Sequence, residues 1–304
     1  MKGWLALALG AAAVAALPLV ADNYTLRLAT MFCMYAALAW SWNVIGGVAG
    51  YPSFATAAFF GLGAYVAAIL QSGGWSMLPA LAAAGLIAAV FAGLVGGAIL
   101  HLRGHYFAIA SLALAEILRE LAIKLEWLTG GGMGLNLPVP RIAMEAQAAL
   151  FLHAMLAVAV LAGAATLWLR GSRLGFALRC IQQNEDAAGM LGVDTRRVKT
   201  LAFILSAGFP GMAGGVYASW THYIEPPDVF DVLISVKPLV MVLLGGLGTA
   251  FGPVLGAALL LFFEEAVWRS FLTLHAAALG LIIVGLVLFL PNGLAGAARR
   301  VFRR

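Results

Sequence analysis

The sequence predicts an all-α protein, a polytopic transmembrane helical bundle of about ten spans. Of its 304 residues, 63% are hydrophobic and 10% are charged, against about 25% charged residues in a typical soluble domain. The mean hydropathy of +0.99 excludes disorder, because disordered chains are poor in hydrophobic residues. The apolar runs are continuous, as in Leu156–Leu169, and so they predict helices rather than the alternating strands of a membrane barrel.

Breaks in hydropathy divide the chain, which we treat as a single transmembrane domain over residues 1–304, into candidate spans. The first apolar run is longer than the usual signal-peptide core of about 7–15 residues, so we expect it to be retained as a span. The predicted spans are Trp4–Val20, Leu28–Ile45, Ala57–Leu70, Leu78–Leu100, Tyr106–Leu125, Ala148–Leu169, Leu201–Trp220, Leu233–Leu244, Pro253–Trp268 and Leu274–Leu290.

Two of these spans, Ala57–Leu70 and Leu233–Leu244, are short and lie beside glycine clusters. The clusters occupy residues 46–50 and 245–248. Broken helices are tolerated in a membrane only where the backbone is buried in protein or lines a cavity, and in transporters they often mark the transport pathway. The sequence therefore predicts two broken helices.

Positive charge sets the expected orientation. With the N-terminus in the cytoplasm, twelve of the 18 Lys and Arg residues fall on the cytoplasmic side, in accord with the positive-inside rule. Both termini are then predicted to be cytoplasmic. These basic residues flank apolar runs instead of forming one solvated patch, so the net charge of +5 does not indicate a nucleic-acid partner.

The longest charged stretch is the loop 170–199, which this orientation places in the cytoplasm. Residues 173–183 mix basic and apolar side chains and predict a short amphipathic helix. Asn184 is a typical N-cap for a second short helix, with two carboxylates in its first turn, and Gly192 is a typical residue to end it. Such a surface suits either lipid headgroups or a soluble protein partner.

Asp186-Ala187-Ala188-x-x-x-Gly192 resembles the EAA loop of ABC-importer permeases, with Asp in place of the usual Glu. In that superfamily the loop is a coupling helix that inserts into a groove on the ATPase subunit. The chain as a whole resembles the branched-chain amino-acid permease family, LivM-type subunit. The matching stretches include Leu38–Gly50, Ser53–Tyr65, Leu102–Ala108, Ala115–Arg119, Ser172–Phe203, Leu243–Gly256 and Phe289–Leu294.

This resemblance implies the membrane-spanning permease of an ABC importer in the bacterial inner membrane. It implies a second related permease, two cytoplasmic ATPases and a periplasmic binding protein as partners, with ATP and Mg²⁺ held by the ATPases and no cofactor on this chain. The implied solute is a branched-chain or other hydrophobic amino acid, with urea, amides and aromatic acids as alternatives within the family. The implied ATPase-coupling residues are Arg173, Arg179, Glu185, Asp186, Ala187, Ala188 and Gly192.

The chain departs from the family pattern beside the first glycine cluster. Tyr51-Pro52 replaces a Gln followed by an apolar residue, Ala55-Thr56 replaces Gly-His, and Lys237 is also atypical. If this region touches the solute, the departures bear on specificity. The candidate pathway residues, chosen because they lie at broken or polar ends of spans, are Ser53, Phe54, Thr56 and Thr129.

An ion- or proton-coupled secondary transporter is the alternative function. It requires Glu116 or Glu264 to titrate during turnover, because ionisable residues within spans are functional candidates. The competing interpretation is that Glu116 pairs with Arg119 three residues along the helix. Co-purification of an ATPase distinguishes the two functions.

Other chemistry finds no support in the sequence. His101 and His105 lack a third metal ligand, and Cys33 and Cys180 lie in dissimilar surroundings that predict neither a disulfide nor a zinc site. The glycine run after Thr129 lacks the Lys-Ser/Thr of a phosphate-binding loop. We therefore predict no catalytic residue, no metal site and no ATP hydrolysis on this chain.

Overall fold

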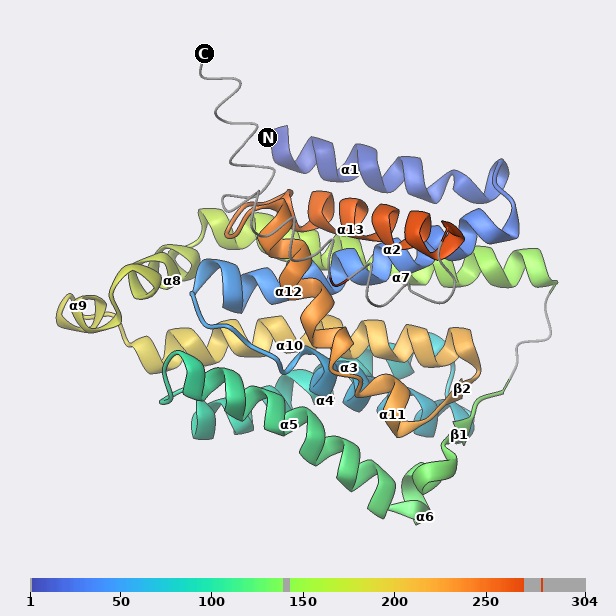
Figure 1. The fold of residues 1–304 in the computed structure, drawn as a ribbon, viewed down its shortest axis with the longest axis horizontal. Coiled ribbons are helices and arrows are strands. Elements are labelled where there is room, and N and C mark those ends of the chain that lie inside the picture. Colours follow the sequence, from blue (N-terminus) through green and yellow to red (C-terminus); the bar gives the residue numbers. More distant parts are fainter. Residues whose placement is uncertain (1, 139–142, 271–279, 281–304) are drawn as a thin grey trace.

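Helices lie side by side along the long axis of the protein (Figure 1). The computed structural model describes residues 2–138, 143–270 and Gly280, so the predicted span Leu274–Leu290 lies outside the described residues. Each of the other predicted spans coincides with a helix. Their bounds are α1 (Lys2–Ala15), α2 (Asn23–Trp42), α3 (Thr56–Ser72), α4 (Met77–Ile99), α5 (His105–Lys124), α7 (Met144–Gly171), α10 (Thr195–Thr221), α12 (Leu233–Gly245) and α13 (Gly252–Ser270).

Within the described residues, 4 helical stretches are long and apolar enough to cross a membrane. They are Asn23–Val48, Met77–Ile99, Met144–Gly171 and Thr195–Thr221. The first helix is shorter than the predicted span Trp4–Val20. Helix α1 ends at Ala15, and the separate 3-10 turn η1 (Leu17–Leu19) follows. Pro18 explains this early end, because proline has no backbone N–H to continue the helical hydrogen bonds and its ring clashes with the carbonyl four residues earlier.

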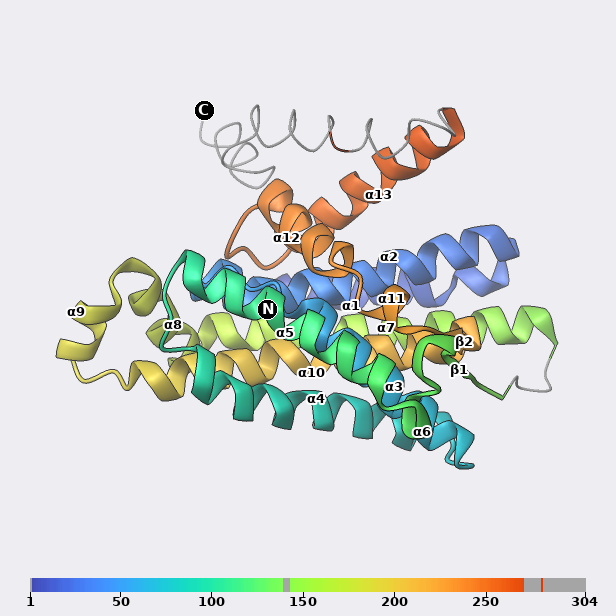
Figure 2. The same cartoon turned by 60° about the horizontal axis from the view of Figure 1, so that its bottom comes forward.

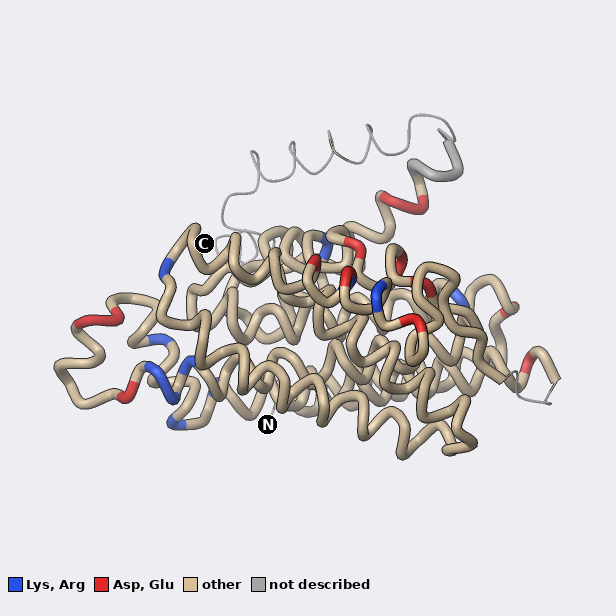
Figure 3. The backbone as a smooth tube through the Cα atoms, turned by 90° about the horizontal axis from the view of Figure 1, so that it is seen from below, with Lys and Arg blue, Asp and Glu red and all other residues tan. Residues whose placement is uncertain are grey.

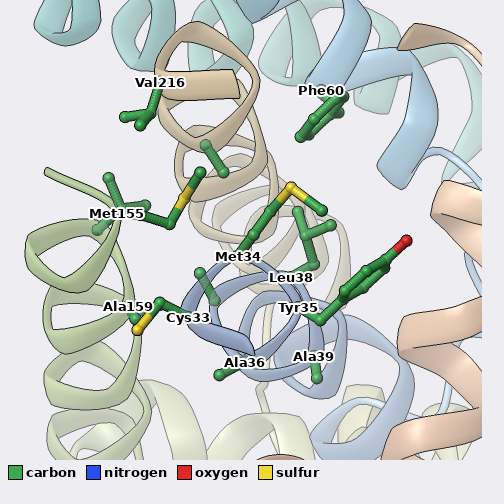
Figure 4. Packing of buried hydrophobic residues seen from close by; sticks show 14 of the residues in the cluster. Cys33, Met34, Tyr35, Ala36, Leu38, Ala39, Phe60, Met155, Ala159 and Val216 are labelled. Atoms are coloured by element: carbon green, nitrogen blue, oxygen red, sulfur yellow. The ribbon is translucent and has the colours of Figure 1, made fainter. Parts of the chain in front are cut away.

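Helix α2 forms the centre of the bundle. In the 18-residue apolar window of Asn23–Val48, which joins α2 to the turn after it, 78% of the residues are buried, against 33% in that of α4. Figure 4 shows Met34 and Leu38 of α2 among Phe60 of α3, Met155 of α7 and Val216 of α10. Figure 2 shows α12 and α13 on one side of the layer that holds α2, α7 and α10, with α4 on the other side.

Glycines bring α3 and α10 into backbone contact. A Cβ atom at Gly63 would lie 2.1 Å from the carbonyl oxygen of Gly211, and one at Gly214 would lie 2.0 Å from that of Phe60. Hydrogen is therefore the only side chain that fits at these crossings. At Gly97 of α4, by contrast, an added Cβ would meet no atom within 4 Å among the described residues.

Both predicted helix breaks are present. Helix α2 continues into a turn of π-helix, η2 (Asn43–Val48), and Gly50 then leaves the helix with a φ of 78°. The chain runs without regular structure to Thr56, where α3 begins. At the second break α12 ends at Gly245, and Gly246 and Gly248 adopt φ values of 118° and 65° before α13 begins. Both clusters thus use backbone conformations that favour glycine.

The two ends of the bundle differ. One end, here called the hairpin end, carries α8 (Arg173–Gln183) and α9 (Glu185–Met190), as predicted for the charged loop. The other, the ribbon end, carries short elements that the sequence did not predict (Figure 1). These are α6 (Glu126–Thr129), the 3-10 turn η3 (Gly131–Met133), the antiparallel strands β1 (Leu135–Asn136) and β2 (Tyr223–Ile224), and α11 (Pro226–Val229). Figure 3 shows many of the Lys and Arg residues gathered at the hairpin end.

Candidate functional site: the hairpin and the helix breaks

The hairpin of α8 and α9 owes its shape to local capping. Ser172 precedes α8, and its hydroxyl oxygen accepts a hydrogen bond of 3.1 Å from the backbone N–H of Gly175. Asn184 separates the two helices, and its side-chain oxygen accepts a bond of 3.0 Å from the N–H of Ala187. These bonds satisfy N–H groups that the first turn of a helix leaves unpaired. The predicted cap at Asn184 is therefore confirmed.

Gly192 ends the hairpin in a left-handed conformation. Its φ is 86°, its N–H donates to the carbonyl of Gly189 at 3.0 Å, and the N–H of Val193 donates to that of Ala188 at 3.1 Å. These two bonds form a Schellman motif. A Cβ at Gly192 would meet nothing within 4 Å in the part of the chain that the structure describes, so a larger residue there is opposed by backbone strain and not by crowding.

Five polar side chains clamp the first turn of α9 to the rest of the protein. The carboxylate of Glu185 lies 2.6 Å from Nζ of Lys199 in α10 and 3.5 Å from Nε of Arg103, and it accepts a hydrogen bond from the Tyr51 hydroxyl. Asp186 accepts two hydrogen bonds from the Arg103 guanidinium, at 2.8 and 3.1 Å. We call Tyr51, Arg103, Glu185, Asp186 and Lys199 the clamp.

Lys199 is the buried centre of the clamp, with a side chain only 4% exposed. A charge at that depth needs several partners to offset its lost hydration. Besides Glu185, its Nζ donates to the hydroxyl of Tyr51 at 3.0 Å and to the carbonyl oxygen of Leu100 at 2.8 Å. It also lies 4.8 Å from the centre of the Tyr51 ring. The ammonium group is therefore fully engaged, and it joins α4, α9, α10 and the segment after the first break.

The protonation states of the clamp follow from these contacts. Burial acts to raise the pKa of Glu185, but the hydrogen bonds from Lys199 and Tyr51 and the charges of Lys199 and Arg103 outweigh it and hold that pKa below its usual range. Hydrogen bonding and charge from Arg103 lower the pKa of Asp186. Burial and the neighbouring Glu185 raise the pKa of Tyr51. Both carboxyl groups are thus ionised at neutral pH, and the Tyr51 hydroxyl remains a donor.

The hairpin also touches the first helix break directly. The side-chain amide of Gln182 donates a hydrogen bond of 3.0 Å to the carbonyl oxygen of Gly47. A Cβ at Gly50 would lie 3.0 Å from Cγ of Gln182, so the two segments are in close contact there. The hairpin is therefore attached to the region of the first break through both Gln182 and the clamp.

The hairpin exposes large apolar side chains beside its charged and polar ones, although it lies at the end of the bundle. Met190 and Leu191 are 87% and 82% exposed, and Phe176 of α8 is 66% exposed. Figure 1 shows α9 extending beyond the ends of its neighbouring helices. Of the predicted coupling residues, Arg173, Asp186, Ala187 and Gly192 are exposed and Arg179 is half-buried. Glu185 is mostly buried, with a side chain 12% exposed, and Ala188 is buried.

The structure separates the predicted pathway residues into two places. Ser53, Phe54 and Thr56 lie together between the first break and α3. The Phe54 backbone donates to the hydroxyl of Ser111 at 2.8 Å and accepts from the hydroxyl of Ser235 at 2.7 Å. The side chains of Ser53 and Thr56 are buried, while Phe54 is partly exposed.

Thr129 lies apart from this group, at the ribbon end. Its hydroxyl donates to the carbonyl oxygens of Ala122 and Leu125, at 2.5 and 2.8 Å, and it accepts from the N–H of Gly131 at 3.2 Å. These hydrogen bonds stabilise the local turn, so Thr129 has a structural role there.

The other ionisable residues singled out by the sequence are paired. Glu116 contacts Arg119 at 2.8 Å, and Glu264 contacts Lys237 at 2.7 Å. Lys237 also lies 5.3 Å from the ring centre of Tyr35. Both cysteines are free thiols, and within the described part of the chain no group of His, Cys, Asp and Glu residues is arranged to hold a metal ion.

Sequence reasoning missed three members of the clamp and the exposed tip. Tyr51 stood out only as a departure from the family pattern, and Arg103 and Lys199 counted only toward orientation and the family match. Lys199 and Tyr51 are 148 positions apart in sequence, so local patterns carry no sign of their contact. Met190 and Leu191 were visible as apolar residues in a charged loop, and that was the available signal.

Comparison with known proteins agrees with the architecture. Residues 24–291 match the model of the family described as branched-chain amino acid transport system / permease component. The permease protein LivM of the high-affinity branched-chain amino acid transport system of Escherichia coli K12 is 32% identical over 312 residues, which cover 93% of this chain and 72% of LivM. No solved structure gives a significant match.

Two further relatives are more distant. LivH, a permease protein of the same kind of system from Salmonella typhimurium, is 25% identical over 88% of this chain and 92% of its own length. LsrC, an autoinducer 2 import permease from Salmonella paratyphi B, is 27% identical over 80% of this chain and 71% of its own length. The chain is therefore a multi-pass membrane protein that belongs to the branched-chain amino-acid permease family of ABC importers, as a LivM-type subunit.

Proposed function

We propose that this permease moves a small hydrophobic amino acid inward and that separate subunits, seated on the α8–α9 hairpin, supply the energy by hydrolysing ATP. The observation that carries the proposal is the apolar tip formed by Met190 and Leu191, which are 87% and 82% exposed. Neighbouring large apolar side chains that are exposed together beyond the end of the bundle mark a candidate interaction surface. The clamp holds this tip in one position, which lowers the entropy lost on docking.

The assignment of the hairpin to an ATPase sets the orientation and the partners. The hairpin end lies in the cytoplasm together with both chain termini, and the ribbon end faces the periplasmic binding protein. The whole chain works as one permease domain beside a second, related permease. The two ATPases hold the ATP and Mg²⁺, and this chain holds no nucleotide, metal or other cofactor.

The substrate class is taken from the relatives. LivM and LivH are named for branched-chain amino acids, whereas LsrC is named for autoinducer 2. LivM has the higher identity, so we propose a branched-chain amino acid. The segment Ser53–Thr56 lies beside the first helix break, and the partly exposed ring of Phe54 is its best candidate for contact with the solute.

Charge on the apolar tip tests the docking surface. We expect Met190→Glu with Leu191→Glu to weaken ATPase binding by about 30-fold or more, the effect of losing an interface hot spot of about 2 kcal/mol. Gly192→Val acts on the same tip by backbone strain and has the same expected result. The measurement is the amount of ATPase that co-purifies with the tagged permease from membranes.

Met133→Glu is the matched control, because Met133 is 85% exposed but lies at the ribbon end. It should keep the wild-type amount of ATPase. Full retention of the ATPase by the Met190→Glu/Leu191→Glu variant would rule out the hairpin tip as the docking surface.

A further inference from the structure

The hairpin is bonded to the first helix break, and the first break is bonded to the second. We propose that Asn43, at the start of η2, is a positioning residue that passes movement of the hairpin to the second break between α12 and α13. This inference rests on the proposed function, since it concerns how ATPase movement reaches the membrane helices. Gln182 and Tyr51 form the first link, and Asn43 forms the second.

The first link joins the hairpin to the segment around η2 at two places. Gln182 of α8 bonds the carbonyl of Gly47 at 3.0 Å, which is a backbone group inside the π-helical turn. Tyr51, just beyond Gly50, bonds Glu185 of α9. Because the two bonds come from different helices of the hairpin, a tilt of the hairpin displaces both ends of the segment between Gly47 and Tyr51.

The second link is the side chain of Asn43, which is fully buried. Its Oδ1 accepts a hydrogen bond of 2.9 Å from the N–H of Gly248, and its Nδ2 donates one of 3.0 Å to the carbonyl of Thr249. The backbones also touch, since a Cβ at Gly47 would lie 2.9 Å from the nitrogen of Gly248. One amide side chain thus bonds the two breaks to each other.

Both linked segments are suited to change direction. A π-helical turn and a run of glycines with positive φ interrupt the regular hydrogen-bond ladder, and such interruptions are where helices bend. Asn43 pairs two backbone groups of the second break, so movement of η2 must carry Gly248 and Thr249 with it or leave the buried amide of Asn43 unpaired. The contacts therefore form one continuous connection from the hairpin to α12 and α13.

The test measures leucine uptake and ATP hydrolysis in the same proteoliposomes, which hold the complete transporter with both permeases, both ATPases and the binding protein. Asn43→Ala should bind the ATPases and hydrolyse ATP at close to the wild-type rate. Its uptake per ATP should fall about fivefold or more, the lower end of typical coupling between distant sites. Ser41→Ala is the matched control, because Ser41 is equally buried on α2 but bonds the carbonyl of Ser206 in α10, away from the second break.

Gln182→Ala tests the first link without disturbing the core, because Gln182 lies on the exposed side of α8. It should lower uptake per ATP, whereas Gln183→Ala, the exposed neighbour, should not. In the double variant with Asn43→Ala the loss should be no greater than in Asn43→Ala alone, since links in series are already broken by the first substitution.

Each result bears on a specific claim. Uptake per ATP equal to wild type in both Asn43→Ala and Gln182→Ala would overturn the inference and leave the proposed function standing. An equal loss in Ser41→Ala would also overturn it, because any loosening of α2 would then have the same effect. Absence of ATP-driven uptake in the wild-type complex would contradict the proposed function itself, and the inference with it.

Discussion

Replacement of Lys199 by Met removes the centre of the clamp while it keeps most of the side-chain volume. The ammonium group is 4% exposed and bonds Glu185, Tyr51 and the carbonyl of Leu100. Removing one partner of a buried ion pair costs about 3–5 kcal/mol. Arg103 stays 3.5 Å from Glu185, whose side chain is 12% exposed, so we expect the lower end, about 3 kcal/mol. The loss should appear as local opening of the hairpin.

Trypsin cleavage after Arg179 in detergent measures that opening. When opening and closing are fast, cleavage follows the population of the open form, and about 3 kcal/mol corresponds to cleavage about 100-fold faster. The variant that also carries Glu185→Leu should be cleaved more slowly than Lys199→Met alone, because it no longer leaves the Glu185 carboxylate, 12% exposed, without its lysine partner. Cleavage of Lys199→Met at the wild-type rate would refute the claim that the clamp holds the hairpin against the helix bundle.

Two further predictions concern packing and pH. Gly256→Ala should lower the melting temperature of the purified permease by an amount equivalent to about 1–3 kcal/mol, because its Cβ would lie 1.7 Å from the carbonyl oxygen of Met241. Gly97→Ala, whose Cβ would meet no described atom within 4 Å, should not lower the melting temperature. An equal loss in both variants would contradict the close approach of Gly256 to Met241. The pKa of Glu185 is lower in the folded chain than its ordinary value of 4.5, so its ionised form stabilises the hairpin above that pH and the stabilisation is lost as the pH falls through the folded pKa. Hydrogen exchange of α9 amides, corrected for intrinsic rates, should show protection that decreases as the pH falls below 4.5, and protection that does not change with pH there would contradict the pairing of Glu185 with Lys199.

Local signals explain what the sequence predicted well. The hairpin was predicted from Asn184 and Gly192, because capping and helix termination depend on residues within a few positions of each other. The helix breaks were predicted for the same reason, since Gly50 and Gly246 act through their own φ angles. The spans followed from continuous apolar runs, except where Pro18 ended α1 early.

Contacts between distant segments explain what the sequence did not reveal. Tyr51 and Glu185 are 134 positions apart, and Asn43 lies 205 positions from Gly248. Contacts between residues this far apart produce no periodic pattern in a single sequence. Thr129 shows a related difficulty, because a threonine beside glycines has the same local appearance whether it meets a solute or holds its own turn.

The central claim is that ATP hydrolysis at the hairpin drives inward transport, and uptake of leucine by proteoliposomes holding the complete transporter tests it most directly. The account predicts uptake that requires ATP on the hairpin side, persists without a proton gradient, and is lost in the Met190→Glu/Leu191→Glu variant but kept in Met133→Glu. Uptake that follows an imposed proton gradient without ATP, and that stops in Glu116→Gln or Glu264→Gln, would contradict the account.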